Sequence, residues 1–264
     1  MKIIAISNQK GGVGKTTTTM NLGAALAALG KRVLLIDLDQ QGSLTHSAGY
    51  DPDNLDTTIY DILSSYADMR QKSPRQLDTV IIELAPNFEL VPANGELAAI
   101  DLELERAFER EHILKRAIAQ MHKSYDYVLL DCPPSLSLLV VNALAAATNV
   151  IIPLQADYLA TKGVKRLLEI IEAVQDSLNP NLHIDGILLT MADQRTAHSR
   201  EVVQSTRERF NGSNIRVFDT VIKTSVRLKE SPVSGQSILK YDPTSEAAAA
   251  YKHLAKEVES NETR

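Results

Sequence analysis

The chain has 264 residues, 44% of them hydrophobic, so it can bury a core large enough for one domain covering residues 1–264. A formal net charge of −5 argues against a surface that is basic throughout, and the single cysteine, Cys132, excludes an internal disulfide. No apolar run approaches the roughly 18 residues of a membrane span and the first residues do not read as a secretory leader, so we expect a cytoplasmic protein.

Short β-branched runs alternate with longer segments of helical periodicity along most of the chain. This alternation predicts an α/β fold with a doubly wound, mostly parallel sheet flanked by helices. The predicted strands are 2–7, 32–37, 88–92, 127–131, 149–154, 186–191 and 217–222. The predicted helices are 16–29, 96–120, 136–147, 161–177, 200–210 and 245–259. Residues 49–86 are predicted to mix helix and loop.

The first predicted strand leads into the sequence NQKGGVGKTT, residues 8–17, just before the first predicted helix. Glycines between a strand and a helix let backbone N–H groups surround an anion, and the helix N-terminus adds partial positive charge. The stretch departs from the usual P-loop pattern at Gln9, where that pattern has glycine, but it keeps Gly14, Lys15 and Thr16. We therefore predict a nucleoside triphosphate site in which Lys15 neutralises the β- and γ-phosphates and the Thr16 hydroxyl ligates Mg²⁺.

Acidic residues stand at the ends of two predicted strands. Asp131 ends the apolar run 127–130, where an acid can reach Mg²⁺ directly or through its water shell, and Asp37 and Asp39 end the strand 32–37. Because the carboxyl ends of strands in an open α/β sheet face the ligand, these acids are predicted to lie near the glycine-rich loop.

Lys10 places a second lysine in the loop, next to the unusual Gln9. This combination is typical of the deviant Walker A group of P-loop ATPases. Together with DLDQQG at 37–42 and DCPPS at 131–135, the stretch resembles the ParA/Soj family of DNA-partitioning ATPases. The likeness extends to LLTM at 188–191, VRL at 226–228 and YDP at 241–243, so it covers nearly the whole chain.

The resemblance implies ATP and Mg²⁺ as cofactors and a slow ATPase stimulated by a partner and by DNA. Lys15 is expected to hold the phosphates of its own nucleotide, whereas Lys10 reaches the partner's nucleotide in an ATP-bound homodimer. Asp39 is expected to position the attacking water, and Asp37 to support the metal and the loop. The implied nucleotide-binding residues are Lys10, Gly11, Gly12, Val13, Gly14, Lys15, Thr16 and Thr17, and the implied metal site comprises Thr16, Asp37 and Asp131.

Basic residues outnumber acidic ones between Arg195 and Lys229, although the whole chain is acidic. Nonspecific DNA binding depends on phosphate neutralisation, so two copies of this segment on one face of a dimer would form a useful surface. The resemblance implies roles in DNA binding for Arg195 and Arg227. Lys223 is a further candidate, because it keeps a positive charge in the sequence Lys-Thr-Ser, 223–225, where relatives have Pro-Arg-Asn. It also implies a ParB-like adaptor protein as the partner that stimulates hydrolysis, and an association with the nucleoid.

Three alternatives remain open from the sequence. A MinD-like ATPase would bind membrane through its C-terminal helix, but the acidic end of this chain favours a helix packed on the core. A metabolic or redox P-loop enzyme is the second alternative. A nitrogenase iron-protein relative would want two well-placed cysteines per chain, whereas this chain has one, and a dethiobiotin-synthetase-like ligase would need neither Lys10 nor a basic segment. A ParA-like ATPase could also position a cargo other than DNA.

Overall fold

The computed structural model describes residues 1–68, 70–71, 73–156, 160–193, 197–210, 212 and 215–260. Within these residues eight strands form one sheet in the order β3-β4-β2-β5-β1-β6-β7-β8. In chain order the strands are β1 (Lys2–Ile6), β2 (Val33–Asp37), β3 (Ile82–Ala85), β4 (Phe88–Val91), β5 (Tyr127–Asp131), β6 (Asn149–Gln155), β7 (His183–Ala192) and β8 (Val217–Lys223). Neighbouring strands pair in parallel, except that β3 and β4 form an antiparallel hairpin. The predicted doubly wound, mostly parallel fold is confirmed.

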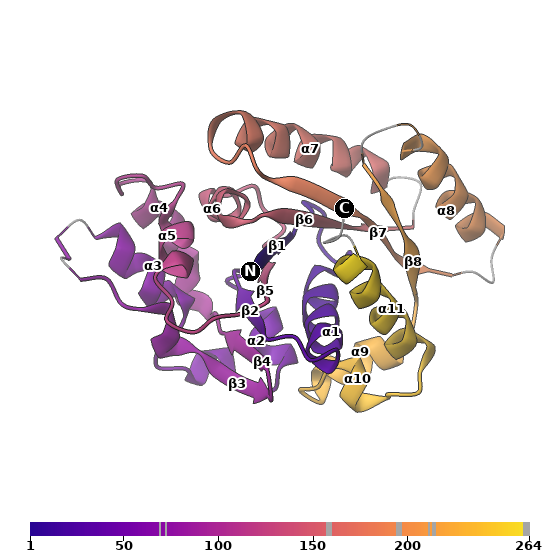
Figure 1. Ribbon diagram of the computed structural model, residues 1–264, viewed down its shortest axis with the longest axis horizontal. Coiled ribbons are helices and arrows are strands. Elements are labelled where there is room, and N and C mark those ends of the chain that lie inside the picture. Colours follow the sequence, from indigo (N-terminus) through magenta and orange to yellow (C-terminus); the bar gives the residue numbers. More distant parts are fainter. Residues whose placement is uncertain are drawn as a thin grey trace.

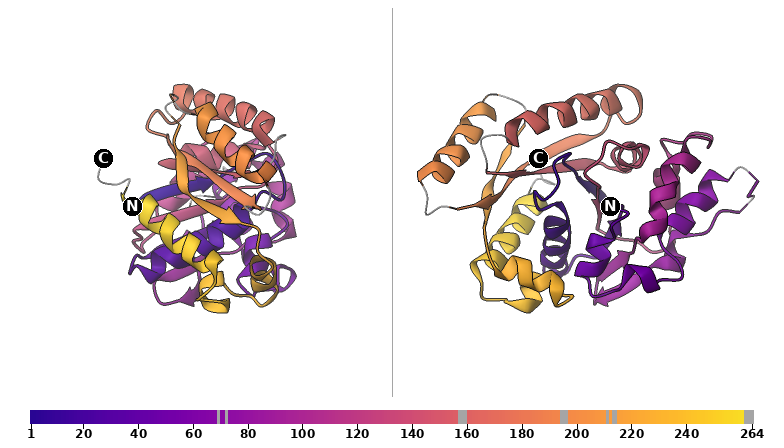
Figure 2. Two further views of the ribbon diagram at one scale, coloured as in Figure 1. Left: turned by 90° about the vertical axis from the view of Figure 1, so that its right-hand side faces the viewer. Right: turned by 180° about the vertical axis from the view of Figure 1, so that it is seen from behind.

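Helices cover both faces of this sheet (Figures 1 and 2). They are α1 (Lys15–Ala28), α2 (Ser43–Ser47), α3 (Ile59–Ala67), α4 (Ile100–Leu104), α5 (Ile113–Ala119), α6 (Leu138–Ala146), α7 (Ala160–Ser177), α8 (Ala197–Phe210), α9 (Arg227–Val233), α10 (Ile238–Tyr241) and α11 (Glu246–Ser260). Short 3₁₀ turns are η1 (Pro52–Asn54), η2 (Leu77–Val80) and η3 (Gly95–Ala99). Helices α1, α10 and α11 pack on one face, and α3 to α7 on the other.

Each parallel strand contributes to both hydrophobic cores because successive side chains point to opposite faces. In β1, Ile3 and Ala5 belong to the core beneath α3 to α7, whereas Ile4 and Ile6 belong to the core beneath α1 and α11. This explains why the strands read as continuous apolar runs rather than as an alternating pattern. Burial on both faces fixes the strand register, and the register in turn fixes which residues meet at the strand ends.

The predicted helix over 96–120 is wrong as one element. Chain 95–104 forms η3 and α4, and α5 begins only at Ile113, with Glu109 between them in the left-handed region at φ 49°. The side chain of Asn142, in α6, hydrogen-bonds to the backbone on both sides of this break. It donates to the Arg110 carbonyl (2.7 Å) and accepts from the Leu114 N–H (3.1 Å). These tertiary hydrogen bonds replace the helical ones, so local periodicity alone could not reveal the interruption.

Strand β3 and helix α9 are two of the elements that differ from the sequence prediction. Strand β3 lies inside the segment that was predicted as helix and loop, and it turns back into β4 through Asn87, whose φ is 62°. Helix α9 was not predicted, and Pro232 lies inside it. Both elements are short, and β3 is an edge strand with partly exposed residues, so the hydrophobic signal of each is weak.

Candidate active site

The glycine-rich loop runs from the end of β1 to the start of α1. Asn8 fixes its first half, because its Nδ2 donates to the Pro153 carbonyl (2.6 Å) and its Oδ1 accepts from the Lys10 N–H (3.0 Å). Gly12 and Gly14 have φ values of 71° and 88°, which glycine adopts without steric cost. Gly14 is the N-cap of α1 and brings no side chain to it, so the first N–H groups of the helix are available to an anion.

The two lysines of the loop occupy different environments. Lys15 is buried, and its Nζ donates to the Lys10 carbonyl across 3.2 Å. Burial lowers the pKa of Lys15, and the carboxylate of Asp131 partly offsets this effect. Lys10 is exposed, and its Nζ lies 3.3 Å from Oε1 of Gln155 at the end of β6. Lys15 therefore turns into its own loop, whereas Lys10 lies at the surface.

Asp131 joins the end of β5 to the first turns of α1. It accepts hydrogen bonds from the hydroxyls of Thr16 (2.7 Å) and Thr19 (3.1 Å), and its register partners are Ile6 of β1 and Asp37 of β2. Burial raises the pKa of Asp131 above its usual range, and Asp37 raises it further. Buried carboxylates beside a hydroxyl are hard oxygen donors whose charge calls for a cation, which fits Mg²⁺.

Asp37 and Asp39 have different surroundings. Asp37 is fully buried and accepts from the Asp39 N–H (3.1 Å), the Thr45 N–H (2.9 Å) and the Thr45 hydroxyl (2.8 Å). Asp39 is half-buried, and its Oδ1 accepts from the Gln41 N–H (3.0 Å). The structure thus brings Thr16 and Asp131 together directly, whereas it holds the Asp37 carboxylate against the loop that carries Asp39.

A cavity of about 220 Å³ continues from the loop toward the ends of β7 and β8. Its lining includes Gly14, Thr17 and Thr190, together with chain 222–225. The Thr190 hydroxyl donates to the Val13 carbonyl across 2.8 Å, so β7 supports the loop directly. The role of Thr190 was not predicted from its chemistry, although its place at a strand end beside the loop is the same signal that identified the acids.

Of the predicted DNA-binding residues, Lys223 lines this cavity and Arg227 immediately precedes the lining residue Leu228, whereas Arg195 is outside the described residues. Lys223 ends β8 and forms an ion pair with Glu246 of α11. Arg227 begins α9 and is exposed. The next two residues of α9, Leu228 and Lys229, also contribute to the lining of the cavity. The described basic candidates are therefore close to the nucleotide side of the protein.

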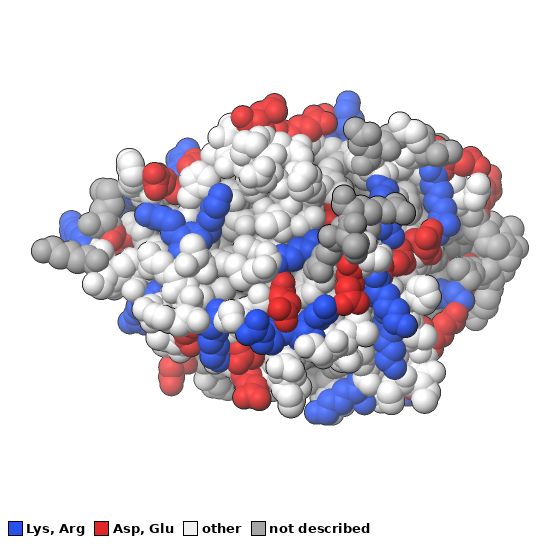
Figure 3. Space-filling model, viewed as in Figure 1, with Lys and Arg blue, Asp and Glu red and all other residues white. Residues whose placement is uncertain are grey.

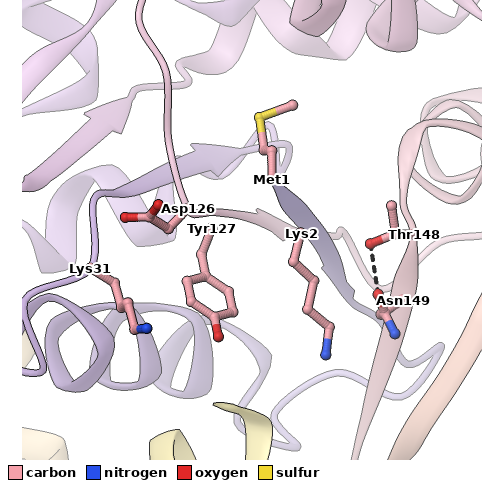
Figure 4. A pocket seen from close by; sticks show the side chains of 7 residues that line it. All are labelled: Met1, Lys2, Lys31, Asp126, Tyr127, Thr148 and Asn149. Carbon is pink, nitrogen blue, oxygen red and sulfur yellow. Dashed lines mark hydrogen bonds between the residues drawn. The ribbon is translucent and has the colours of Figure 1, made fainter. Parts of the chain in front are cut away.

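A second, larger cavity, of about 520 Å³, lies at the opposite ends of the strands, where β1, β5 and β6 begin. Lys2, Lys31 and Tyr127 point into it from the beginnings of strands and the turn before β2 (Figure 4). Both ammonium groups already have carboxylate partners, Asp185 at 2.9 Å for Lys2 and Glu259 at 2.7 Å for Lys31. On the face seen in Figure 3, basic and acidic side chains are intermixed. This cavity therefore lacks both the loop and the excess positive charge that a triphosphate needs.

A phosphate-binding loop between a central strand and its helix, with a buried carboxylate at the end of the neighbouring strand, is the arrangement of a P-loop nucleoside triphosphatase. The family described as AAA domain matches residues 1–184. With relatives above 40% identity over nearly its whole length, the chain belongs to the ParA/Soj family of DNA-partitioning ATPases.

The individual similarities support this assignment. The chain is 45% identical over 260 residues to the sporulation initiation inhibitor protein Soj of Bacillus subtilis, covering 98% of this chain and 99% of Soj. It is 41% identical over 264 residues to the chromosome partitioning protein ParA of Caulobacter vibrioides, covering 99% and 95%. The crystal structure of cobyrinic acid a,c-diamide synthase from Mycobacterium smegmatis with bound ADP and magnesium is 36% identical, with a TM-score of 0.85 and coverage of 100% and 96%.

Helix α11 has an apolar face that is packed against the sheet. Its Tyr251, Leu254, Ala255 and Val258 are all buried, in the same core as α1. The sequence prediction of a C-terminal helix packed on the core is confirmed. Among the described residues, we find no helix whose length and apolar character would let it cross a membrane.

Proposed function

We propose that this chain acts as one ATPase domain, residues 1–264, which binds Mg·ATP, forms a homodimer in that state, and binds DNA without sequence specificity. The protein is cytoplasmic and associates with the nucleoid in this proposal. A ParB-like adaptor then stimulates hydrolysis and so releases the protein from the DNA. The observation that carries the proposal is the separation of the two loop lysines, one buried in its own loop and the other exposed at the surface.

The loop supplies the triphosphate site in this proposal. Backbone N–H groups of chain 11–17 surround the phosphates, and Lys15 neutralises the β- and γ-phosphates. Thr16 and Asp131, which already contact each other at 2.7 Å, hold Mg²⁺. When bound there, Mg²⁺ would neutralise negative charge on the phosphates. Asp39 aligns the attacking water, and Asp37 supports both the metal and the loop.

Lys10 supplies the dimer contact. A cation on the loop surface can pair with the γ-phosphate of a facing protomer, so ATP becomes part of the interface and its hydrolysis removes the paired charge. In the structure the Lys10 ammonium lies 3.3 Å from a neutral amide oxygen, Oε1 of Gln155, which a phosphate would outcompete as an acceptor of a charged donor.

DNA binding follows from dimerisation. Lys223 and Arg227 lie near the nucleotide site, and the sequence places Arg195 in the same basic segment. One copy offers few cations, whereas two copies on one face roughly double the number of phosphates neutralised and steepen the dependence of affinity on salt. The ATP state thereby controls affinity for the nucleoid.

The test combines light scattering with DNA binding, each measured with ATP, with ADP and with a slowly hydrolysed ATP analogue. The wild type is expected to dimerise and bind DNA only with the triphosphates. Lys10→Ala is expected to bind nucleotide as a monomer, Asp39→Ala to remain dimeric on DNA, and Arg227→Glu to dimerise without binding DNA. Lys115→Ala, an exposed lysine of α5, serves as the control. Equal DNA binding with ADP and ATP would rule out the proposal.

The similarity to the structure of cobyrinic acid a,c-diamide synthase makes a ligase the specific form of the metabolic alternative. A ligase would couple ATP hydrolysis to a second small substrate and would be indifferent to DNA. Stimulation of hydrolysis by duplex DNA together with the adaptor therefore distinguishes partitioning from ligase activity. ATP-dependent sedimentation with liposomes would instead indicate a MinD-like function. ATP-dependent DNA binding with no adaptor that itself binds DNA would indicate a ParA-like ATPase that positions a cargo other than DNA.

A further inference from the structure

Thr45 of α2 joins three segments of the chain. Its N–H and its hydroxyl both donate to Oδ2 of Asp37, at 2.9 and 2.8 Å. The same hydroxyl oxygen accepts from the N–H of Ala93, just after β4, at 2.9 Å. Thr45 and Asp37 are each 0% exposed, so water cannot replace these partners.

The second oxygen of Asp37 continues the chain of hydrogen bonds to Asp39. Asp37 Oδ1 accepts from the Asp39 N–H at 3.1 Å, and the Asp39 carbonyl accepts from the Gly42 N–H at 2.8 Å. Gly42 has φ 58°, and a Cβ there would lie 2.7 Å from Pro52 and 3.2 Å from the Ala93 oxygen. The turn between β2 and α2 is therefore closely packed at Gly42, against Pro52 and Ala93.

We propose that Thr45 is a positioning residue for ATP hydrolysis: its hydroxyl fixes Asp37 against β4, and Asp37 fixes the backbone of Asp39. The inference rests on the proposed role of Asp39 in positioning the attacking water. Asp39 is half-buried on a loop, so its backbone anchors, rather than packing of its own side chain, determine where its carboxylate lies. An error of about 1 Å in such a group can cost about 100-fold in rate.

The effect of Thr45 is expected on turnover rather than on nucleotide binding. The phosphate loop is built by β1, α1 and the contacts of Asn8 and Thr190, none of which involves Thr45. Loss of the Thr45 hydroxyl therefore leaves the phosphate loop, Thr16 and Asp131 in place, and the Thr45 N–H still donates to Asp37. The loop that carries Asp39 loses its hydrogen bond to the chain after β4. Binding of ATP, dimerisation and DNA binding do not need the exact placement of the loop that carries Asp39.

The experiment compares Thr45→Val, which keeps the shape and the backbone donor but removes the hydroxyl, with Thr45→Ser, which restores the hydroxyl. For Thr45→Val we expect kcat to fall by about 10- to 100-fold, with KM for ATP and affinity for a slowly hydrolysed analogue unchanged. Thr45→Ser is expected to recover most of the rate. Thr206→Val removes another buried hydroxyl, which donates to Val202 within α8, and is expected to leave kcat unchanged.

Asp39→Ala and the double variant Thr45→Val/Asp39→Ala separate this inference from the proposed function. If Thr45 acts through Asp39, the double variant hydrolyses ATP no more slowly than Asp39→Ala alone. An unchanged kcat for Asp39→Ala would contradict the role of Asp39 itself. A reduced rate for Asp39→Ala with a wild-type rate for Thr45→Val would overturn only the role of Thr45. The same conclusion would follow if Thr45→Val lost nucleotide affinity in parallel with kcat. If circular dichroism shows Thr45→Val to be unfolded, Thr45→Ala is measured with the same expectation.

Discussion

Arg227 and Glu230 form an ion pair within the first turn of α9, with 3.0 Å between Nη1 and Oε2. The Nε of the same guanidinium lies 3.5 Å from Oδ2 of Asp242, just after α10. Lys223 is likewise paired, with Glu246. Both described cations that we assign to DNA binding are therefore held by carboxylates of their own chain, and a DNA phosphate must compete with these carboxylates.

Removing one competing carboxylate is expected to strengthen DNA binding. Glu230→Gln keeps the size of the side chain but removes its charge, so the side chain at position 230 pairs more weakly with Arg227. Because exposed ion pairs are individually weak, we expect the Kd for duplex DNA to fall by about two- to fivefold per protomer in the ATP state. Fluorescence anisotropy with a labelled duplex at fixed salt measures the change.

The control separates a specific competitor from the general effect of removing negative charge. In an Arg227→Ala background the Glu230→Gln change is expected to have little effect, because no guanidinium is left to release. Glu208→Gln removes an acid from α8 whose carboxylate accepts a hydrogen bond from the neutral amide of Gln204. An equal gain in affinity from Glu208→Gln would show that only net charge matters.

Gly235, which follows α9, is expected to tolerate no side chain. Its φ is 64°, and a Cβ there would lie 2.5 Å from the Cα of Gly49, at the end of the turn after α2. Gly235→Ala thus combines backbone strain with an overlap against backbone, and we expect it to lower the free energy of unfolding by more than about 2 kcal/mol. Urea unfolding measures this loss. Gly95→Ala, with open space around its Cβ, is expected to be nearly neutral, and an equal loss there would contradict the argument.

Much of the nucleotide site could be predicted from the sequence because its parts lie at strand ends. Apolar runs located β1, β2 and β5, and parallel pairing then required Asp37 and Asp131 to meet beside the loop that follows β1. Lys15 and Thr16 followed from the order of strand, glycines and helix. These inferences need only the direction of the strands, which short-range patterns determine.

The environment of each group could not be predicted in the same way. Asp37 and Asp39 are equivalent in the sequence, yet one is buried against Thr45 and the other is half-buried on a loop, because α2 folds back over the end of β2. The break between α4 and α5 depends on Asn142, 32 residues beyond Arg110. Such contacts join residues far apart in sequence, so local periodicity carries no signal for them.

Asp131→Asn is expected to abolish magnesium-dependent hydrolysis while making the nucleotide-free protein more stable. Burial and Asp37 disfavour the ionised form of Asp131, which is why its pKa is raised. A neutral amide removes this cost, and we expect a gain of about 1 kcal/mol in the free energy of unfolding, measured in urea without magnesium or nucleotide. Asp126→Asn is the control with the opposite sign, since the Arg32 N–H lowers the pKa of Asp126. Destabilisation by both variants would show that the Asp131 carboxylate does not lower the free energy of unfolding of the nucleotide-free protein.

Glu257 of α11 is expected to give the protein a pH-dependent attachment between that helix and β8. Its carboxylate accepts from the N–H groups of Asp219 (3.0 Å) and Thr220 (2.8 Å), from the Thr220 hydroxyl, and from Arg216 (2.7 Å). Burial alone would raise the pKa of Glu257, but these donors outweigh it and hold the pKa below its usual value. A carboxyl with a lowered folded-state pKa contributes stability above its unfolded pKa, and loses it as the pH falls through the folded pKa.

Glu257→Gln is therefore expected to cost about 1–3 kcal/mol in the free energy of unfolding at pH 7, because two backbone donors and a guanidinium lose a charged acceptor. The difference between wild type and variant should shrink steadily as the pH is lowered from about 5 toward 3, since the wild-type carboxyl becomes protonated over that range. Urea unfolding of both proteins at each pH isolates this single group, because all other carboxyls are shared. Glu259→Gln, whose carboxylate pairs with Lys31 in a more exposed setting, should show a much smaller difference at pH 7. A Glu257→Gln difference that stayed constant with pH would mean that the packing of α11, and not the charge of Glu257, is what holds the helix to β8.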